Sequence, residues 1–198
     1  MMRTNAITPE ERLEIRRKTA KPLLWLGIVS IIMLFAGLTS AYVVSKGTAN
    51  DAIWFNFNFP NFFWISSAVI LLSSVTMNMA IQAAKKDDQK GIRNGLLLTL
   101  FLGLAFCLTQ WFGWKELVAQ KIFLVEQINN AGKYLYFISG LHLLHLFGGL
   151  LSVSVTIKNA SKLRYSSANY IGLQLTALYW HFLDILWIYL CLFFWFIH

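Results

Sequence analysis

Five long apolar runs dominate the chain, and short polar stretches separate them. The runs cover about 23–45, 62–84, 94–115, 134–157 and 170–197. Each is long enough for an α-helix to cross a hydrocarbon layer of roughly 30 Å, which takes about 20 residues. The pattern therefore predicts an all-α, polytopic membrane protein: a bundle of five transmembrane helices.

The connections between the runs are short, which favours antiparallel neighbours and one bundle without a separate soluble domain. We expect two parts along the chain. Residues 1–22 would form a cytoplasmic N-terminal tail with a short surface helix, and residues 23–198 a single transmembrane domain.

The basic residues predict the orientation of the bundle. Thirteen of the 17 Lys and Arg residues lie in the N-terminal tail and in the second and fourth connections. Because cytoplasmic segments carry the excess of Lys and Arg, the N-terminus is predicted inside and the C-terminus outside. The net charge of +8 has the same origin and does not indicate a nucleic-acid partner.

The composition agrees with a membrane protein. Hydrophobic residues make up 57% of the chain and charged residues only 13%, whereas soluble domains carry about 25% charged residues. Cys107 and Cys191 both lie in apolar runs and have no CxxC context. We expect them to pack as small hydrophobic side chains, without a disulfide or a cysteine metal site.

Each run carries a narrow stripe of small or polar residues at helical spacing. In the first run the stripe is Ser30, Gly37 and Ala41, and the third run includes Gln110 and Trp114. Small residues allow helices to approach closely, and polar side chains bond across the contact. These stripes are predicted to face the bundle interior or a partner.

Two pairs of residues could carry chemistry: His142 with His145, and His181 with Asp184. Each pair is three residues apart on one helical face, and a rise of 1.5 Å per residue places His145 and His181 near mid-depth. Asp184 is the only acidic residue in any apolar run. Three imidazoles and one carboxylate are metal-ligand types.

Three interpretations of these pairs stay open at this point. A di-iron carboxylate site needs several glutamates, and the apolar runs hold one acid. A proton relay needs titratable groups leading to both surfaces, and the first three runs contain no Asp, Glu or His. The favoured interpretation is an inward-facing, hydrogen-bonded structural cluster of His142, His145, His181 and Asp184, since unpaired polar groups are unfavourable in lipid.

Two motifs in the chain resemble subunit III of the haem–copper terminal oxidases, the cytochrome c and quinol oxidase family. They are "GLHLLHLFGG" (140–149) and "YWHFLDILWIYL" (179–190), the second being long and chemically unusual. Three further segments are similar to helices of that family: "LFAGLTSAYVV" (34–44), "FWISSAVILLSSVTMNMA" (63–80) and "LGLAFCLTQWFGW" (102–114).

The resemblance implies the five-helix bacterial form of the subunit, in the cytoplasmic (inner) membrane. It implies a non-catalytic subunit of a proton-pumping complex of aerobic respiration that reduces dioxygen to water. The haems and copper would lie in partner subunits I and II, with none in this chain. The chain would stabilise subunit I, bind phospholipids, and support oxygen access and proton uptake. Subunit II, a small fourth subunit and a respiratory supercomplex are further candidate partners.

Candidate interface or lipid contacts are Gln110, Trp114, Gln174, Tyr179 and Trp180. Two positions depart from the family pattern, because Ile31 and Gln174 stand where the family usually has glutamates. The roles of those carboxylates are therefore not carried over to this chain.

Two other functions are kept as alternatives: an accessory subunit of a nitric oxide reductase, which shares the fold, and a self-contained metal-binding membrane enzyme. The electron donor, cytochrome c or quinol, is left open because donor sites lie on other chains.

Overall fold

Five α-helices make up most of the protein. The computed structural model describes residues 9–48, 59–122, 130–167 and 169–197, with helices α1 (Pro9–Thr48), α2 (Asn61–Lys85), α3 (Gln89–Ala119), α4 (Asn130–Ser161) and α5 (Ile171–Ile197). Each contains a segment long and apolar enough to cross a membrane. The prediction of an all-α protein with five membrane-spanning helices is confirmed.

The helices extend beyond the apolar runs that predicted them. Helix α3 begins at Gln89 instead of about residue 94, because the Asp88 side chain accepts hydrogen bonds from the backbone N–H groups of Lys90 (3.1 Å) and Gly91 (3.0 Å). Such a cap satisfies donors that the first helical turn leaves free. The length of each apolar run therefore corresponds to the part of the helix inside the lipid layer, whereas capping residues determine where the whole helix begins and ends.

Helices α2, α3 and α4 share one kind of C-terminus. After each, a residue other than glycine has a positive φ: Asp87 (56°), Lys121 (61°) and Leu163 (54°). The next residue then donates its N–H five positions back, as from Asp88 to the Ala83 carbonyl at 3.0 Å. This Schellman arrangement usually places glycine at the left-handed position.

Helix α1 differs from the predicted arrangement at its start. A short surface helix was expected before the first span, but a single helix runs from Pro9 through Pro22 to Thr48. An exposed ion pair joins Glu14 to Lys18 at 2.8 Å, in the i, i+4 geometry that supports a helix. The division of the chain at residue 22 remains a prediction.

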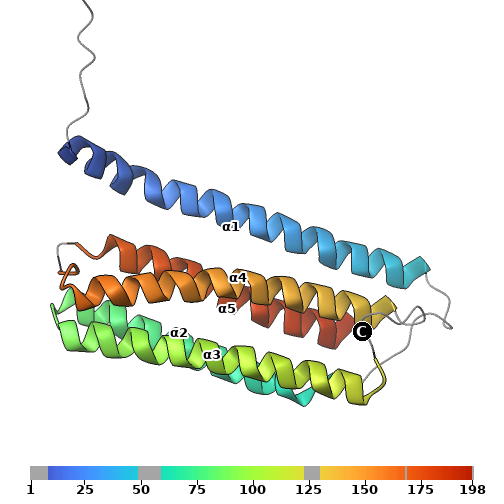
Figure 1. Ribbon diagram of the computed structural model, residues 1–198. Coiled ribbons are helices and arrows are strands. Elements are labelled where there is room, and N and C mark those ends of the chain that lie inside the picture. The colour runs from blue at the N-terminus through green and yellow to red at the C-terminus, as the bar shows by residue number, and fades with distance from the viewer. Residues whose placement is uncertain (1–8, 49–58, 123–129, 168, 198) are drawn as a thin grey trace, which may run out of the picture.

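The helices form three layers (Figure 1). Helices α2 and α3 make one layer, α4 and α5 the middle layer, and α1 lies on the other side of the middle layer. Among the described helices, α1 contacts only α4 and α5. We call the end of the bundle that carries Lys85, Arg93 and Lys158 the basic end. The C-terminus lies at the opposite end (Figure 1).

Two glycines bring α2 and α3 close together. A Cβ on Gly95 would lie 3.0 Å from the backbone nitrogen of Ala80, and one on Gly113 would lie 2.4 Å from the Phe63 ring. Only a residue without a side chain fits at such separations. This contact follows the small-residue rule for helix packing in membranes.

The small-residue stripe of α1 does not face the bundle interior, and that it faces a partner stays a prediction. Ser30, Gly37 and Ala41 are exposed, and a Cβ on Gly37 would meet nothing within 4 Å. The helix instead packs through large side chains, of which Phe35 is 1% and Tyr42 0% exposed. Large aromatic surfaces give α1 more contact area than the small residues would.

Candidate functional site

Trp180 of α5 lies at the junction of four helices. Its side chain is fully buried, and its indole N–H donates to the Ser73 hydroxyl of α2 at 3.0 Å. Glycines of α3 and α4 make room for the ring, because a Cβ on Gly103 would lie 2.8 Å and one on Gly149 3.3 Å from it. Trp180 therefore links α2, α3, α4 and α5.

Trp187 repeats this arrangement two turns further along α5. Its indole N–H donates to the Ser67 hydroxyl of α2 at 3.2 Å, and its ring packs against Phe63 and Phe106 with centroids 5.6 and 5.1 Å away. Tryptophans seven residues apart on one helix thus pair with serines six apart on its antiparallel neighbour. Each contact combines a large buried area with a satisfied polar group.

His181 bonds to α2 through both ring nitrogens. Its Nδ1 lies 2.7 Å from the Ser74 hydroxyl, and its Nε2 lies 3.2 Å from Oδ1 of Asn78. Asp184, one turn on, is 3% exposed, and its Oδ2 lies 3.7 Å from Nδ1 of His181. Within the described chain, neither oxygen of Asp184 has a hydrogen-bond partner.

The two histidines of α4 have different surroundings. His142 is 1% exposed, and its ring lies among those of Phe35, Phe106 and Trp187, with centroids 6.5, 6.0 and 5.2 Å away. Neither of its ring nitrogens has a partner within the described part of the chain. His145 is half-buried, and its Nδ1 bonds to the Leu141 carbonyl of its own helix at 2.8 Å.

The four residues expected to form one polar cluster therefore do not bond to one another as a set. His181 and Asp184 adjoin α2, whereas His142 and His145 contact Phe35 of α1. Among the described residues, no three His, Cys, Asp or Glu side chains lie close enough to hold a metal ion. His142 is an exception to the expectation that buried polar groups are paired, because its ring nitrogens have no hydrogen-bond partner among the described residues, whereas Asp184 has the His181 ring 3.7 Å away.

The candidate contact residues of α3 lie inside the chain, at least in part. Gln110 is 1% exposed, and its amide has no hydrogen-bond partner among the described residues. Trp114 is half-buried, and its indole N–H donates to the Ser139 hydroxyl of α4 at 3.1 Å. Gln110 is therefore not a surface contact.

The remaining candidates all lie on α5. The Tyr179 hydroxyl donates to the His145 carbonyl at 3.2 Å, which joins α5 to α4. Gln174 is half-buried near the start of the helix. Trp180, described above, is buried and does not contact lipid or a partner.

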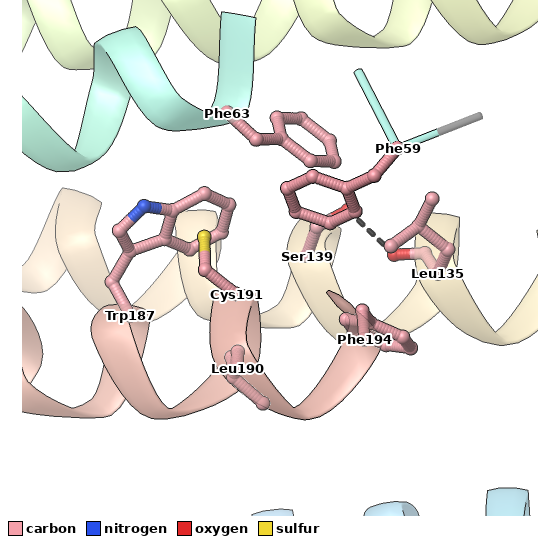
Figure 2. A pocket seen from close by; sticks show the side chains of 8 residues that line it. All are labelled: Phe59, Phe63, Leu135, Ser139, Trp187, Leu190, Cys191 and Phe194. Atoms are coloured by element: carbon pink, nitrogen blue, oxygen red, sulfur yellow. Dashed lines mark hydrogen bonds between the residues drawn. The ribbon is translucent and has the colours of Figure 1, made fainter. Parts of the chain in front are cut away.

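A small cavity lies between α2, α4 and α5, near the C-terminal end of α5 (Figure 2). Aromatic rings supply much of its wall, and the Ser139 hydroxyl on one side donates to the Leu135 carbonyl at 2.6 Å. Cys191 also lines it, 3.5 Å from the Ser67 hydroxyl, and forms no disulfide. With a volume of about 10 Å³, the cavity has room for one water-sized molecule at most.

At the basic end, two hydrogen bonds join the turn after α2 to the segment before α5, and we call them the loop tie. The Asp87 carboxylate accepts a hydrogen bond from the Ser167 backbone N–H at 2.6 Å, and the Gln89 amide donates to the Tyr165 carbonyl at 2.6 Å. The hydrogen bonds from Ser167 lower the pKa of Asp87 below its usual value of 3.8. The turn between α2 and α3 is thereby joined to the segment that leads into α5.

Sequence reasoning missed Trp187, Ser73 and Phe35 as parts of this polar and aromatic core. A signal was present for Trp187 and Ser73, because the tryptophan spacing of seven on α5 nearly matches the spacing of six between Ser67 and Ser73 on α2. For Phe35 no signal was present, since a phenylalanine in an apolar run fits lipid as well as a helix contact.

Known proteins resemble this chain over most of its length. The family model for cytochrome c oxidase subunit III matches residues 16–197. A probable cytochrome c oxidase subunit 3 of Nocardia farcinica is 29% identical over 174 residues, which cover 84% of this chain and 81% of that protein.

Two further relatives carry related names. A cytochrome c oxidase subunit 3 of Corynebacterium diphtheriae is 28% identical, over 79% of this chain and 78% of that protein. A cytochrome bo(3) ubiquinol oxidase subunit 3 of Buchnera aphidicola is 29% identical, over 83% of this chain and 87% of that protein. Proteins named for cytochrome c and for ubiquinol are thus equally similar to it. The match over nearly the whole chain, together with five membrane-spanning helices, shows that this protein belongs to the cytochrome c oxidase subunit III family of the haem–copper terminal oxidases.

Proposed function

We propose that this chain is a non-catalytic structural subunit of its oxidase, and that the redox centres and proton translocation belong to its partners. As a member of the family it is part of an oxidoreductase complex with other oxidase subunits. The observation that carries the proposal is the use of the histidines. His181 uses both ring nitrogens in bonds to α2 side chains, and among the described residues neither His142 nor His145 lies in a group of three His, Cys, Asp or Glu side chains that could hold a metal ion.

Several finer roles belong to the same proposal. Subunit I would be the main partner, with subunit II and a small fourth subunit in the same complex. The chain would bind phospholipids, and it would support oxygen access and proton uptake in its neighbour. The membrane would be the bacterial inner membrane, with the N-terminus cytoplasmic. These roles rest on the family resemblance and on the basic residues that gather at one end of the bundle.

Purification tests the proposal. The complex is isolated through a tag on this chain, its subunits are identified by mass spectrometry, and the chain is then separated from them in detergent. We expect oxidase subunits I and II to co-purify, and the separated chain to show no haem absorption band and no stoichiometric metal. The remaining complex should keep its full haem and copper content.

Other outcomes would overturn the proposal. A stoichiometric metal on the separated chain, lost on substitution of His145 and His181, would indicate a metal-binding enzyme. Co-purification of nitric oxide reductase subunits instead of oxidase subunits would place the chain in that complex.

A further inference from the structure

A polar surface runs along the contact between α2 and α5, within the span that crosses the membrane. It consists of Ser74 and Asn78 on α2 and Gln174 and His181 on α5, and we call it the polar seam. Asn78 is exposed, and the His181 side chain is 27% exposed. Gln174 lies seven residues before His181, and therefore on the same face of α5.

The part of the seam formed by Asn78 and His181 lies within the hydrocarbon region, whereas Gln174, three residues after the start of α5, lies close to the basic end. Asn78 is seven residues from Lys85, the last residue of α2, so a rise of 1.5 Å per residue puts it about 10 Å from the basic end. His181 bonds to Asn78 and therefore has nearly the same depth. Neither group is close enough to a headgroup layer to be hydrated there.

The seam has unused hydrogen-bonding capacity. Oδ1 of Asn78 is an acceptor, so Nε2 of His181 must be the donor in the bond between them. The amide nitrogen of Asn78, with two N–H groups, donates to nothing in the described chain, and the Gln174 side chain likewise makes no hydrogen bond there. Hydrocarbon offers no acceptor, so the Asn78 amide is unfavourable if it is left in lipid.

The surface of α3 and α4 provides the contrast. A shallow groove there is lined by apolar side chains, including Val118, Phe137, Leu141 and Leu144. Leu144 is 64% exposed at mid-helix, with no polar side chain among the groove residues except the ring edges of Trp114 and Tyr136. Such a face suits lipid tails, whereas the seam does not.

We propose that the polar seam is covered, in the assembled oxidase, by a transmembrane helix of another subunit. That helix places a side-chain oxygen of Ser, Thr, Asn or Gln, or a free carbonyl, opposite the Asn78 amide nitrogen, with apolar residues on either side of it. Hydrogen bonds between side chains are a known means by which membrane helices associate. The inference rests on the proposed function, because it needs the other oxidase subunits, and it assigns them a face of this chain.

Site-specific photocrosslinking in the intact complex tests the assignment. A photoreactive residue replaces Leu71, which is 52% exposed and lies seven residues before Asn78 on the same face of α2. Leu144 is replaced in the matched control. We expect the Leu71 position to form an adduct with another oxidase subunit, and the Leu144 position to react with lipid. Adducts of the Leu71 position with lipid or with a second copy of this chain would overturn the inference.

Substitution at the amide gives an independent measurement. Asn78→Leu should weaken retention of this chain in the purified complex by roughly three- to tenfold, the range of a single membrane hydrogen bond. Asn78→Gln, which keeps the amide, should restore most of it. Equal retention of both variants and wild type would contradict the inference. Absence of every oxidase subunit from the wild-type preparation would refute the proposed function itself, so the two failures are distinguishable.

Discussion

Helices α1 and α5 are both long and apolar, yet they relate to the rest of the molecule in opposite ways. In α5, 44% of an 18-residue apolar stretch is buried inside the chain, whereas in α1 the share is 17%. Helix α5 contacts α1, α2, α3 and α4 and carries the two buried tryptophans, while α1 contacts only α4 and α5 among the described helices. Apolar length therefore measures membrane crossing, and it says little about how much a helix contributes to the core.

The largest expected difference in stability between the two helices is that between Trp180→Ala on α5 and Trp25→Ala on α1. Trp180 is fully buried, whereas Trp25 on α1 is 53% exposed. We expect loss of the buried ring to lower the free energy of unfolding by about 3–5 kcal/mol. The exposed ring should change it by less than about 0.5 kcal/mol. Reversible unfolding of the purified chain in mixed micelles measures both, and similar effects would mean that α1 is packed as α5 is.

Glycine substitutions should change stability in opposite directions in the two environments. A Cβ on Gly103 would meet Leu150 and Trp180 at 2.8 Å, so Gly103→Ala should destabilise the chain by about 1–3 kcal/mol. Gly37 has nothing within 4 Å, so Gly37→Ala should be neutral or stabilise the helix by about 0.5–1 kcal/mol. The same unfolding assay applies, and a loss of stability with Gly37→Ala would show that α1 packs on its small-residue face.

A hydrogen bond joins the middle of α1 to α5. Thr39 Oγ1 lies 3.2 Å from the Tyr189 hydroxyl, and Thr39 also bonds to the Phe35 carbonyl of its own helix. Tyr189→Phe should therefore lower stability by only about 0.6 kcal/mol, the average for such bonds in membranes. Ser30→Ala, which removes a bond to the Leu26 carbonyl of its own helix, is the control and should have a smaller effect. A double-mutant cycle with Thr39→Val that gives no coupling would argue against this contact.

The smallest effect concerns the loop tie that precedes α5 at the basic end. Because hydrogen bonds from Ser167 lower the pKa of Asp87 below 3.8, the tie is complete above that pH and weakens as the pH falls through the lower, folded-state value. The protection factor of the Ser167 amide, which is the ratio of its intrinsic to its observed exchange rate, should therefore be high at pH 6 and fall once the pH drops below 3.8. In Asp87→Asn this pH dependence should vanish, and its persistence would assign it to another group.

The sequence was sufficient to predict the number of helices, because an apolar run long enough to cross a membrane rarely adopts any structure other than a membrane-spanning helix. Helix ends were harder, since Asp88 and the left-handed Asp87, Lys121 and Leu163 act through local geometry that hydropathy does not record. The face of α1 could not be predicted for a deeper reason. Lipid tails are as apolar as leucine, so no amphipathic pattern distinguishes an inward face from an outward one.

Sequence reasoning named candidate site residues without the helices that they meet. Helical spacing predicts that His142 with His145, and His181 with Asp184, lie one turn apart on shared faces. It could not say which helix each face meets, because periodicity within one helix carries no information on the order of helices around a bundle. That order brings His181 to Ser74 and Asn78, and His142 to Phe35 and Trp187.

The layered order of the helices has a consequence for how the protein is made. Of the five described helices α1 leaves the ribosome first, whereas both of its neighbours, α4 and α5, are synthesised after α2 and α3. Meanwhile α2 and α3, joined by a turn of three residues, can pair as soon as both are inserted. Helix α1 must therefore remain in lipid without its two neighbours until α4 and α5 follow, and the many exposed apolar side chains on its surface allow it to do so.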